Sequence, residues 1–371
     1  MAMELQSRLI FIDTSAFENK NFQFDSHKLD QLCGFLEKRK LHLLTTEITI
    51  QEVKKHLKEK AKKAAGTIKK AQKEAMILRN TPTLDCHGIF SAIKEDDINN
   101  ILMDAFDKFL AISNAEIVPI NIVDASIVFE NYFNSLPPFC GENKKNEFPD
   151  AFALEAVRKV SEEREHLLYV ISCDGDMKAY AEQYENIFHL KTVDDLIDLV
   201  IRNEAELSKP VSFADKVFTR LEPEIIKTIH AKLSDMEFYP DSSYYLDVDI
   251  ERIIINQVSV INKNLIEVSQ HRATYELEIE ISVSAEYSAA NYENSPWDPE
   301  DREYVFIVTD RLHINHKEKT FVDVSLNYED ELVARATVDD IEFIDSLISL
   351  DMDDAENILQ ESSYDPDDYE K

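Results

Sequence analysis

The stretch that decides the fold is residues 8–15, RLIFIDTS, in which four apolar residues lead into an acid and two hydroxyl residues. A short apolar run without polar alternation is typical of a strand buried on both faces of a sheet. Thr14 and Ser15, which follow Asp13, are residues suited to the start of a helix. The stretch therefore predicts a strand that ends on a carboxylate and turns directly into a helix.

The same alternation continues outward from this stretch to about residue 204. Four further segments are predicted strands: LHLLTT (41–46), IVPI (117–120), LLYVIS (167–172) and NIFHL (186–190). Apolar residues at helical spacing separate them and predict helices over residues 27–39, 49–79 and 149–164. Strands that alternate with helices in this way predict an α/β domain with a central, mainly parallel sheet flanked by helices.

The rest of the chain has a different pattern. After a helical stretch at 212–233, apolar and polar residues alternate at period two in four segments, 244–264, 273–289, 303–315 and 321–330. Within the second of these, Tyr275, Leu277 and Ile279 alternate with three glutamates, which predicts an antiparallel sheet with one wet, acidic face. Residues 339–371 predict one or two acidic helices and a disordered end. We therefore expect an α/β domain at 1–204, an α+β domain at 205–350 and an acidic tail at 351–371.

Charge is distributed as unevenly as structure. The 371 residues include 40 Lys+Arg and 73 Asp+Glu, a net charge of −33, and taken whole such a chain repels nucleic acid. Residues 1–204 carry only −8 of this, however, and residues 205–371 carry −25. The chain has only 5 glycines, too few and too scattered for the phosphate loops of P-loop or dinucleotide-binding proteins.

Cysteines and hydropathy indicate the compartment. The four cysteines lie far apart with no CxxC pair, so that a zinc ribbon or disulfide scaffold is excluded and buried, reduced thiols are expected. No apolar stretch is long enough for a signal peptide core or a membrane span. We expect a soluble, cytoplasmic protein that has no membrane partner.

Acids stand where the predicted strands end or the next helix begins. Asp13, Asp150 and Asp174 could each be a helix or turn cap, and Glu52 a solvated helix residue. Together they would repel one another at one sheet edge, a cost that divalent cations remove. Carboxylate oxygens select Mg²⁺ or Mn²⁺, and such ions assist phosphodiester hydrolysis. The pattern therefore predicts a metal-dependent phosphoryl-transfer or hydrolysis site.

The motifs FIDTS, EITIQEVKKH, KKNEFPDAFAL and VISCDGDM, in this order, resemble those of the PIN-domain nucleases. The likeness covers residues 8–200 and is greatest to a bacterial branch with the Pro-Pro-Phe and Lys-Lys-x-Glu-Phe-Pro-Asp-Ala strings. It implies an Mg²⁺- or Mn²⁺-dependent endoribonuclease, with toxin-like or phage-defence roles among stand-alone bacterial relatives. The acids it implies as catalytic metal ligands are Asp13, Glu52, Asp150 and Asp174, with Asp176 as an additional ligand.

Some positions remain open in this assignment. Thr14 or Ser15 matches the hydroxyl that often follows the first acid, and Glu47 competes with Glu52 for the second position. Glu52 is preferred because it precedes an apolar residue inside a helix, as the second acid of the family does. Glu147 belongs to the third motif and is expected to support the ligands rather than to be one.

A cationic segment begins two residues after Glu52. Residues 54–79 contain ten Lys+Arg and two Glu, a charge of +8, which is either an ordinary solvated helix face or a track for phosphates. Few aromatic residues interleave with these lysines, so they do not indicate base stacking. His56 shares the helix face of Glu52, but metal-activated water needs no histidine base. The expected RNA-binding residues are Thr14, Lys54, Lys55, Lys58, Lys62, Lys144 and Lys145.

Alternatives to an RNA-cleaving enzyme remain at this point. The chain could be a catalytically silent PIN-like adaptor for RNA or protein, or a structure-selective DNA nuclease. The acidic C-terminal part could serve solubility, dock onto the lysines within or between subunits, or bind a protein partner, and an oligomer is possible. His313 and His316 lack a cysteine that would suggest zinc, and Trp297 is expected to be a packing residue.

Overall fold

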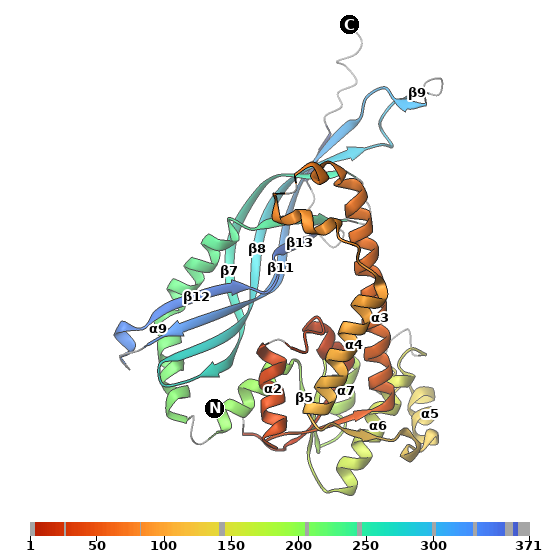
Figure 1. Cartoon of the computed structure of the whole chain (residues 1–371), viewed down its shortest axis with the longest axis vertical. Coiled ribbons are helices and arrows are strands. Elements are labelled where there is room, and N and C mark those ends of the chain that lie inside the picture. The colour runs from red at the N-terminus through yellow and green to blue at the C-terminus, as the bar shows by residue number, and fades with distance from the viewer. Residues whose placement is uncertain are drawn as a thin grey trace. The chain divides into compact units, whose positions relative to one another are not determined.

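The structure, a computed structural model, describes residues 4–25, 27–81, 83–140, 145–204, 208–242, 247–298, 302–328, 332–352 and 359–362. The chain divides into two compact units, Met1–Asn203 and Glu204–Lys371 (Figure 1). In the described residues, no helix is both long and apolar enough to cross a membrane.

The first unit is built on a five-stranded parallel sheet. Its strands are β1 (Leu9–Ile12), β2 (His42–Thr46), β3 (Glu116–Val118), β4 (Leu168–Ile171) and β5 (Ile187–Leu190), in the order β3-β2-β1-β4-β5. β1 lies at the centre and all four of its residues are buried, as its uninterrupted apolar run predicts. The expected parallel sheet with flanking helices is confirmed for this unit.

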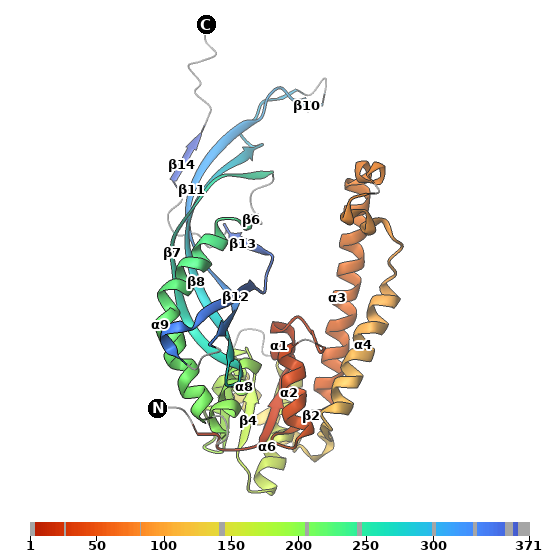
Figure 2. The same cartoon turned by 60° about the vertical axis from the view of Figure 1, so that its left-hand side comes forward.

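Eight α-helices connect and cover these strands in the described part of the unit (Figures 1 and 2). They are α1 (Thr14–Asn19), α2 (His27–Glu37), α3 (Glu47–Glu74), α4 (Glu95–Ile112), α5 (Ala125–Asn134), α6 (Phe148–Glu163), α7 (Gly175–Ala181) and α8 (Val193–Asn203). Leu9 and Phe11 of β1 pack with α6 and α7 in one core cluster. Ile10 and Ile12, which point to the opposite face of the sheet, are buried as well.

Helices α3 and α4 lie side by side as a long pair (Figure 2). Thr46 caps α3 by accepting a hydrogen bond from Thr49 N, and the 28 residues of the helix extend about 42 Å. Val53, Leu57 and Ala61, four residues apart, are buried on one face of α3, and α4 buries Phe106 and Phe109. Residues 95–112, between α3 and β3, therefore supply the helix that packs against α3.

The second unit combines one long helix with an antiparallel sheet. Helix α9 (Ser208–Leu233) precedes strands β7 (Val248–Val268), β8 (Arg272–Asn291), β11 (Val308–Asn327) and β12 (Thr337–Phe343), which pair in the order β12-β11-β8-β7. β14 (Leu359–Ser362) also pairs with β11. Two smaller pairs complete the unit: β6 (Glu237–Asp241) with β13 (Leu347–Asp351), and β9 (Trp297–Asp298) with β10 (Glu303–Tyr304). The expected antiparallel sheet is confirmed.

Three details of this unit were predicted wrongly. Residues 308–327 form one strand, β11, where two were expected, because alternation continues through the polar residues 315–319. Residues 337–351 form strands and not helices, since Ile348, Leu350 and Met352 are buried in alternation. The acidic face of β8 is not uniformly wet, because Glu276, which lies opposite Asn264 and Asp323 on its neighbours, is only 2% exposed.

The cysteines also differ from expectation. Cys33 is buried and free, in keeping with a small hydrophobic residue, and burial raises the pKa of its thiol to about 11. Cys140 and Cys173 are free too, but they are exposed.

The α3–α4 packing gives a prediction about stability. Replacing the fully buried Leu57 by alanine (Leu57→Ala) removes apolar contact and leaves a cavity, so we expect a loss of about 2–5 kcal/mol. The exposed Lys62→Ala, on the same helix, is the matched control and should change stability by less than about 0.5 kcal/mol. Hydrogen exchange of peptides from α3 and α4 measures the difference, and equal protection in both variants would contradict the packing described.

Candidate metal centre

Two of the predicted acids follow neighbouring strands of the sheet. Asp13 follows β1 and Asp174 lies two residues beyond Ser172 at the end of β4, which pairs with β1 in parallel. The backbone N–H of Asp13 donates a hydrogen bond to the Ile171 carbonyl at 2.9 Å, which extends the pairing to the acid itself. Both carboxylates therefore lie at the carboxyl edge of the sheet, where open parallel sheets bind ligands.

Hydroxyl groups hold the Asp13 carboxylate in place. Asp13 caps helix α1, and its Oδ2 accepts hydrogen bonds from Ser15 N at 3.1 Å, from Ser15 Oγ, and from Ser172 Oγ at 2.9 Å. Ser172 Oγ in turn accepts a hydrogen bond from Asp174 N at 3.0 Å. Ser172 thus links the ends of β1 and β4, a role that its position inside VISCDGDM did not suggest.

Asp174 is the cap of the next helix. Its Oδ1 accepts a hydrogen bond from Asp176 N at 2.7 Å at the start of α7. Burial and the neighbouring Asp174 charge raise the pKa of Asp176. Asp174 is therefore a helix cap, as one of the two interpretations expected. Capping uses only one of its carboxylate oxygens, so the other is available for a ligand.

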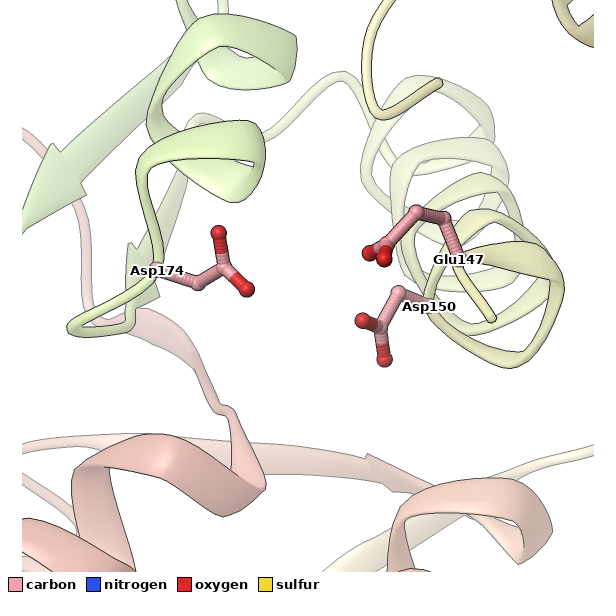
Figure 3. Close-up of side chains that lie close together, drawn as sticks. All are labelled: Glu147, Asp150 and Asp174. Atoms are coloured by element: carbon pink, nitrogen blue, oxygen red, sulfur yellow. The ribbon is translucent and has the colours of Figure 1, made fainter. Parts of the chain in front are cut away.

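Helix α6 brings two more acids to the same place. Glu147 is the N-cap residue of α6, Pro149 lies in the first turn, and Asp150 follows it. One carboxylate oxygen from each of Glu147, Asp150 and Asp174 lies within 4.8 Å of the others (Figure 3). Figure 3 shows Glu147 and Asp150 projecting from α6 toward Asp174 across the gap. In the described residues this is the one cluster of three or more possible metal-ligating side chains.

Glu52 joins the cluster from helix α3. Burial and the charge of Asp13 raise the pKa of Glu52, while His56, Thr14 and Lys55 act in the opposite direction. Thr14 Oγ1 is buried and has no hydrogen-bond partner of normal geometry, although it is close enough to Glu52 to influence its pKa. A buried hydroxyl beside two carboxylates, with no well-aligned hydrogen bond, fits a ligand at this point.

Asp150 is the most strongly perturbed acid of the group. Burial raises its pKa to about 8, and the charges of Asp13, Glu52, Glu147 and Asp174 add to the effect. Since these four acids come from β1, α3, α6 and the end of β4, five carboxylates act on one another at one edge of the sheet. The structure thus brings together all four predicted principal acids and adds Glu147, which was expected only to support them. For Glu147, burial, Asp174 and Asp176 raise the pKa.

The competing second acid lies elsewhere on α3. Glu47 is the first residue of the helix and is exposed. Five residues correspond to about 7.5 Å along a helix, and Glu47 is not among the charges that raise the pKa of Asp150. The geometry favours Glu52.

A cluster of this composition fits a divalent cation. Close carboxylates cannot all ionise at low cost in a partly buried site, and the raised pKa of Asp150 reflects its burial first and the repulsion second. Their oxygens are the hard ligands that Mg²⁺ and Mn²⁺ prefer. A bound cation would offset the repulsion and leave the carboxylates ionised at neutral pH.

The lysines of the cationic segment fall into two groups, those that form ion pairs within the described part of the protein and those that do not. Lys54 Nζ lies 2.9 Å from Asp107 on α4 and Lys60 Nζ lies 2.9 Å from Glu18, so both belong to intramolecular ion pairs. Lys145 is exposed, and Lys144 lies outside the described residues. Five other lysines of α3 are exposed and have no ion pair within the described segments: Lys55, Lys58, Lys62, Lys69 and Lys73. Because they are spaced 3, 4, 7 and 4 residues apart, their side chains lie within about 60° of one another around the helix axis and form a stripe along the helix.

The histidines do not extend the site. His56 Nδ1 lies 3.4 Å from Glu18 Oε2, and its ring packs against Phe22. His316 is buried in the middle of β11, with Nε2 at 2.7 Å from the hydroxyl of Tyr287, and belongs to no metal-ligating cluster of described residues. Trp297 is 52% exposed and contacts Tyr304, so it is not the buried packing residue that was expected.

The first unit is therefore an α/β domain that carries a cluster of carboxylates at the carboxyl ends of its parallel strands. Residues 10–177 match the family model described as PIN domain, which confirms the resemblance: the N-terminal unit of this chain is a PIN domain. PIN domains are generally metal-dependent nucleases, and the match ends before the second unit. No curated protein and no solved structure is similar enough to the chain to count as a match.

The repulsion at Asp150 gives a prediction about the metal-free protein. The pKa of Asp150 is about 8 in the folded state, above its ordinary value, so the stability associated with this group is present at low pH and is lost as the pH rises through about 8. Asp150→Asn removes the charge, and in EDTA at pH 8–9 we expect the variant to melt at a higher temperature than the parent, by about 2–4 °C per kcal/mol relieved.

Thermal unfolding in EDTA across this pH range measures the effect. The matched control is Asp124→Asn, because hydrogen bonds from Ser126 lower the pKa of Asp124, which is outside the cluster. This control should not gain stability with rising pH. A lower melting temperature for Asp150→Asn at pH 8 would show that the carboxylates do not repel one another as described.

Proposed function

We propose that this protein is a metal-dependent endoribonuclease that hydrolyses RNA phosphodiester bonds. The observation that carries the proposal is the convergence of Glu147, Asp150 and Asp174 within 4.8 Å at the sheet edge, with the pKa of Asp150 raised to about 8. Raised pKa values that come from burial and like charges are typical of functional sites. The PIN-domain match supports a nucleic acid as the substrate.

Asp13, Glu52, Asp150 and Asp174 would hold Mg²⁺ or Mn²⁺, and Asp176 and Glu147 are additional candidate ligands. When bound, such a cation lowers the pKa of water and offsets negative charge on a phosphate. Ser15 and Ser172 fix the orientation of Asp13 by bonding to one oxygen only. The Thr14 hydroxyl, buried beside Glu52, is suited to a hydrogen bond with a ligand or substrate oxygen. We expect products with a 5′-phosphate and a 3′-hydroxyl.

The test of the site is substitution of its two central acids. Asp13→Asn and Asp150→Asn keep the shape of the side chain but remove its charge, so cleavage of total RNA in Mn²⁺ should fall by a factor of about 100 or more. EDTA should abolish cleavage by the parent protein, and excess Mg²⁺ or Mn²⁺ should restore it. Glu47→Gln, an acid on α3 outside the cluster, is the control and should cut normally. Normal cleavage by both Asn variants would overturn the site.

The lysine stripe of α3 is proposed as the contact for the RNA backbone. Lys55 begins the stripe three residues after Glu52 and lowers the pKa of that acid, which joins the stripe to the acid cluster. The remaining predicted contacts are Lys58, Lys62, Lys145 and Lys144. Lys54 is a weaker candidate, since its ion pair with Asp107 must break before it can bind a phosphate.

Substitution of the stripe should change the salt dependence of binding. The triple variant Lys58→Ala, Lys62→Ala and Lys69→Ala removes three phosphate contacts, and the slope of log Kd against log salt concentration for single-stranded RNA should decrease by about 2. Filter binding in EDTA at several salt concentrations measures it. Lys60→Ala, whose amine is paired with Glu18, should alter the slope much less. An unchanged slope in the triple variant would mean that the strand does not follow α3.

The alternatives make different predictions. A catalytically silent adaptor would bind RNA and leave it intact with or without EDTA, whereas a DNA nuclease would prefer flap DNA to single-stranded RNA. We favour cleavage over a silent adaptor because the acids expected as metal ligands act on one another at one place, and we favour RNA over DNA because the sequence motifs resemble those of endoribonucleases. A toxin-like or phage-defence role and a cytoplasmic location are consistent with this activity and remain part of the proposal.

We propose that the second unit either regulates the nuclease domain or recruits a partner protein. Residues 205–371 carry a charge of −25, which suits docking onto the lysines of its own or another subunit, or onto a cationic protein. Strands β12 and β13 lie at residues 337–351, so this idea is tested by charge substitution on the exposed face and not by truncation.

A further inference from the structure

An aromatic surface lies beside the acid cluster, on helix α5 and the first turn of α6. Phe129 and Phe133 stand one turn apart on α5 and are 46% and 76% exposed, and their rings are 6.3 Å apart with an angle of 29° between the planes. Exposure of large aromatic rings in one place is unusual in a protein without a ligand there. We call Phe129, Phe133 and Phe148 the aromatic patch.

Contacts with neighbouring aromatic rings hold the patch in place. The half-buried Phe148 contacts Phe129 at a ring distance of 5.3 Å and the fully buried Phe139 at 5.0 Å. Tyr132 contacts Phe148 at 4.9 Å and Phe133 at 5.4 Å. Rings fixed in this way lose little conformational freedom when a ligand binds, which favours binding.

The patch borders the end of α6 that carries part of the proposed metal centre. Phe148 stands between Glu147 and Asp150 in the first turn of α6, and α5 packs against α6 (Figure 1). Phe148 is about 100° around the helix from Glu147, whereas Phe148 and Asp150, two residues apart, project in nearly opposite directions, about 160° apart. Since a helix with its side chains is about 10–12 Å wide, a bound strand would pass around the end of α6 to reach from the carboxylates to the patch. The exposed Lys145 lies two residues before Glu147.

We infer that the aromatic patch binds unpaired bases of the RNA strand whose phosphodiester lies at the acid cluster. Aromatic rings bind bases by stacking, without a need for hydrogen-bond donors, and the faces of the bases are most accessible in a single strand. The inference rests on the proposed function, and it adds the surface that would hold the bases next to the cut. The patch itself consists of aromatic rings, and the nearby Ile127 and Leu136 are exposed as well. A bound strand would bring bases here as its phosphates approach Asp150 and Lys145.

Binding of a matched pair of strands tests the inference. The full chain carrying Asp150→Asn, which prevents cleavage, is titrated in EDTA with a labelled oligouridine of about 12 nucleotides and with an abasic sugar-phosphate strand of the same length. Phe129→Ala and Phe133→Ala should each weaken oligouridine binding by about 5- to 100-fold and leave abasic binding unchanged. Fluorescence anisotropy gives both dissociation constants.

Conservative variants separate stacking from simple apolar contact. Phe133→Trp keeps an aromatic face and should bind oligouridine as well as the parent, whereas Phe133→Leu keeps an apolar side chain and should bind as poorly as alanine. Phe133 is 76% exposed, so these changes should leave the fold intact, which circular dichroism verifies. Tyr239→Ala, an exposed ring in the second unit, is the control and should change nothing.

Each other outcome would overturn the inference. Equal weakening of both strands would mean that the patch acts on the backbone, and unchanged binding would mean that it does not meet RNA. A change of oligomeric state in sedimentation, with RNA binding unaltered, would assign the patch to contact with a second copy. Because the readout is binding, loss of base recognition and absence of cleavage are separate results, so the inference and the proposed function can fail independently.

Discussion

Repulsion between carboxylates at one sheet edge is the constraint on which the functional end of this domain depends. Burial and the charges of four other acids together raise the pKa of Asp150 to about 8, so that its ionisation at neutral pH is unfavourable. A protein tolerates such a cost where a ligand of opposite charge offsets it. The same repulsion explains why the acids are attached to four different elements, since each element fixes its acid independently of its neighbours.

The fold supplies that rigidity through backbone and hydroxyl groups. The hydrogen bond from Asp13 N to the Ile171 carbonyl continues the β1–β4 pairing, and Ser172 joins Asp13 to Asp174. Both aspartates are also helix caps, so interpreting them as caps or as ligands poses no conflict: capping uses one oxygen and fixes the direction of the other. A cap at the end of a buried parallel strand is a way to present a carboxylate with little freedom.

Much of this was predictable from sequence, and the remainder depends on tertiary packing. The five parallel strands and the acids after β1 and β4 follow from apolar runs and their ends. The proximity of Glu147, the bridge through Ser172 and the pairing of Lys54 with Asp107 do not, because each joins segments far apart in the chain. The spacing of apolar residues in 337–351 is compatible with a helix or with strands. These residues form strands because β12 pairs with β11 and β13 pairs with β6.

The aromatic patch and the lysine stripe show why a net charge of −33 does not argue against a nucleic-acid partner. In the proposed arrangement, a bound strand would meet the carboxylate cluster at the point where cations would neutralise it. Beside that point it would meet exposed lysines on α3 and exposed rings on α5. The lysines give affinity that declines with salt, and the rings give affinity that does not depend on charge. Recognition that combines both can persist at salt concentrations where the lysines alone would release the strand.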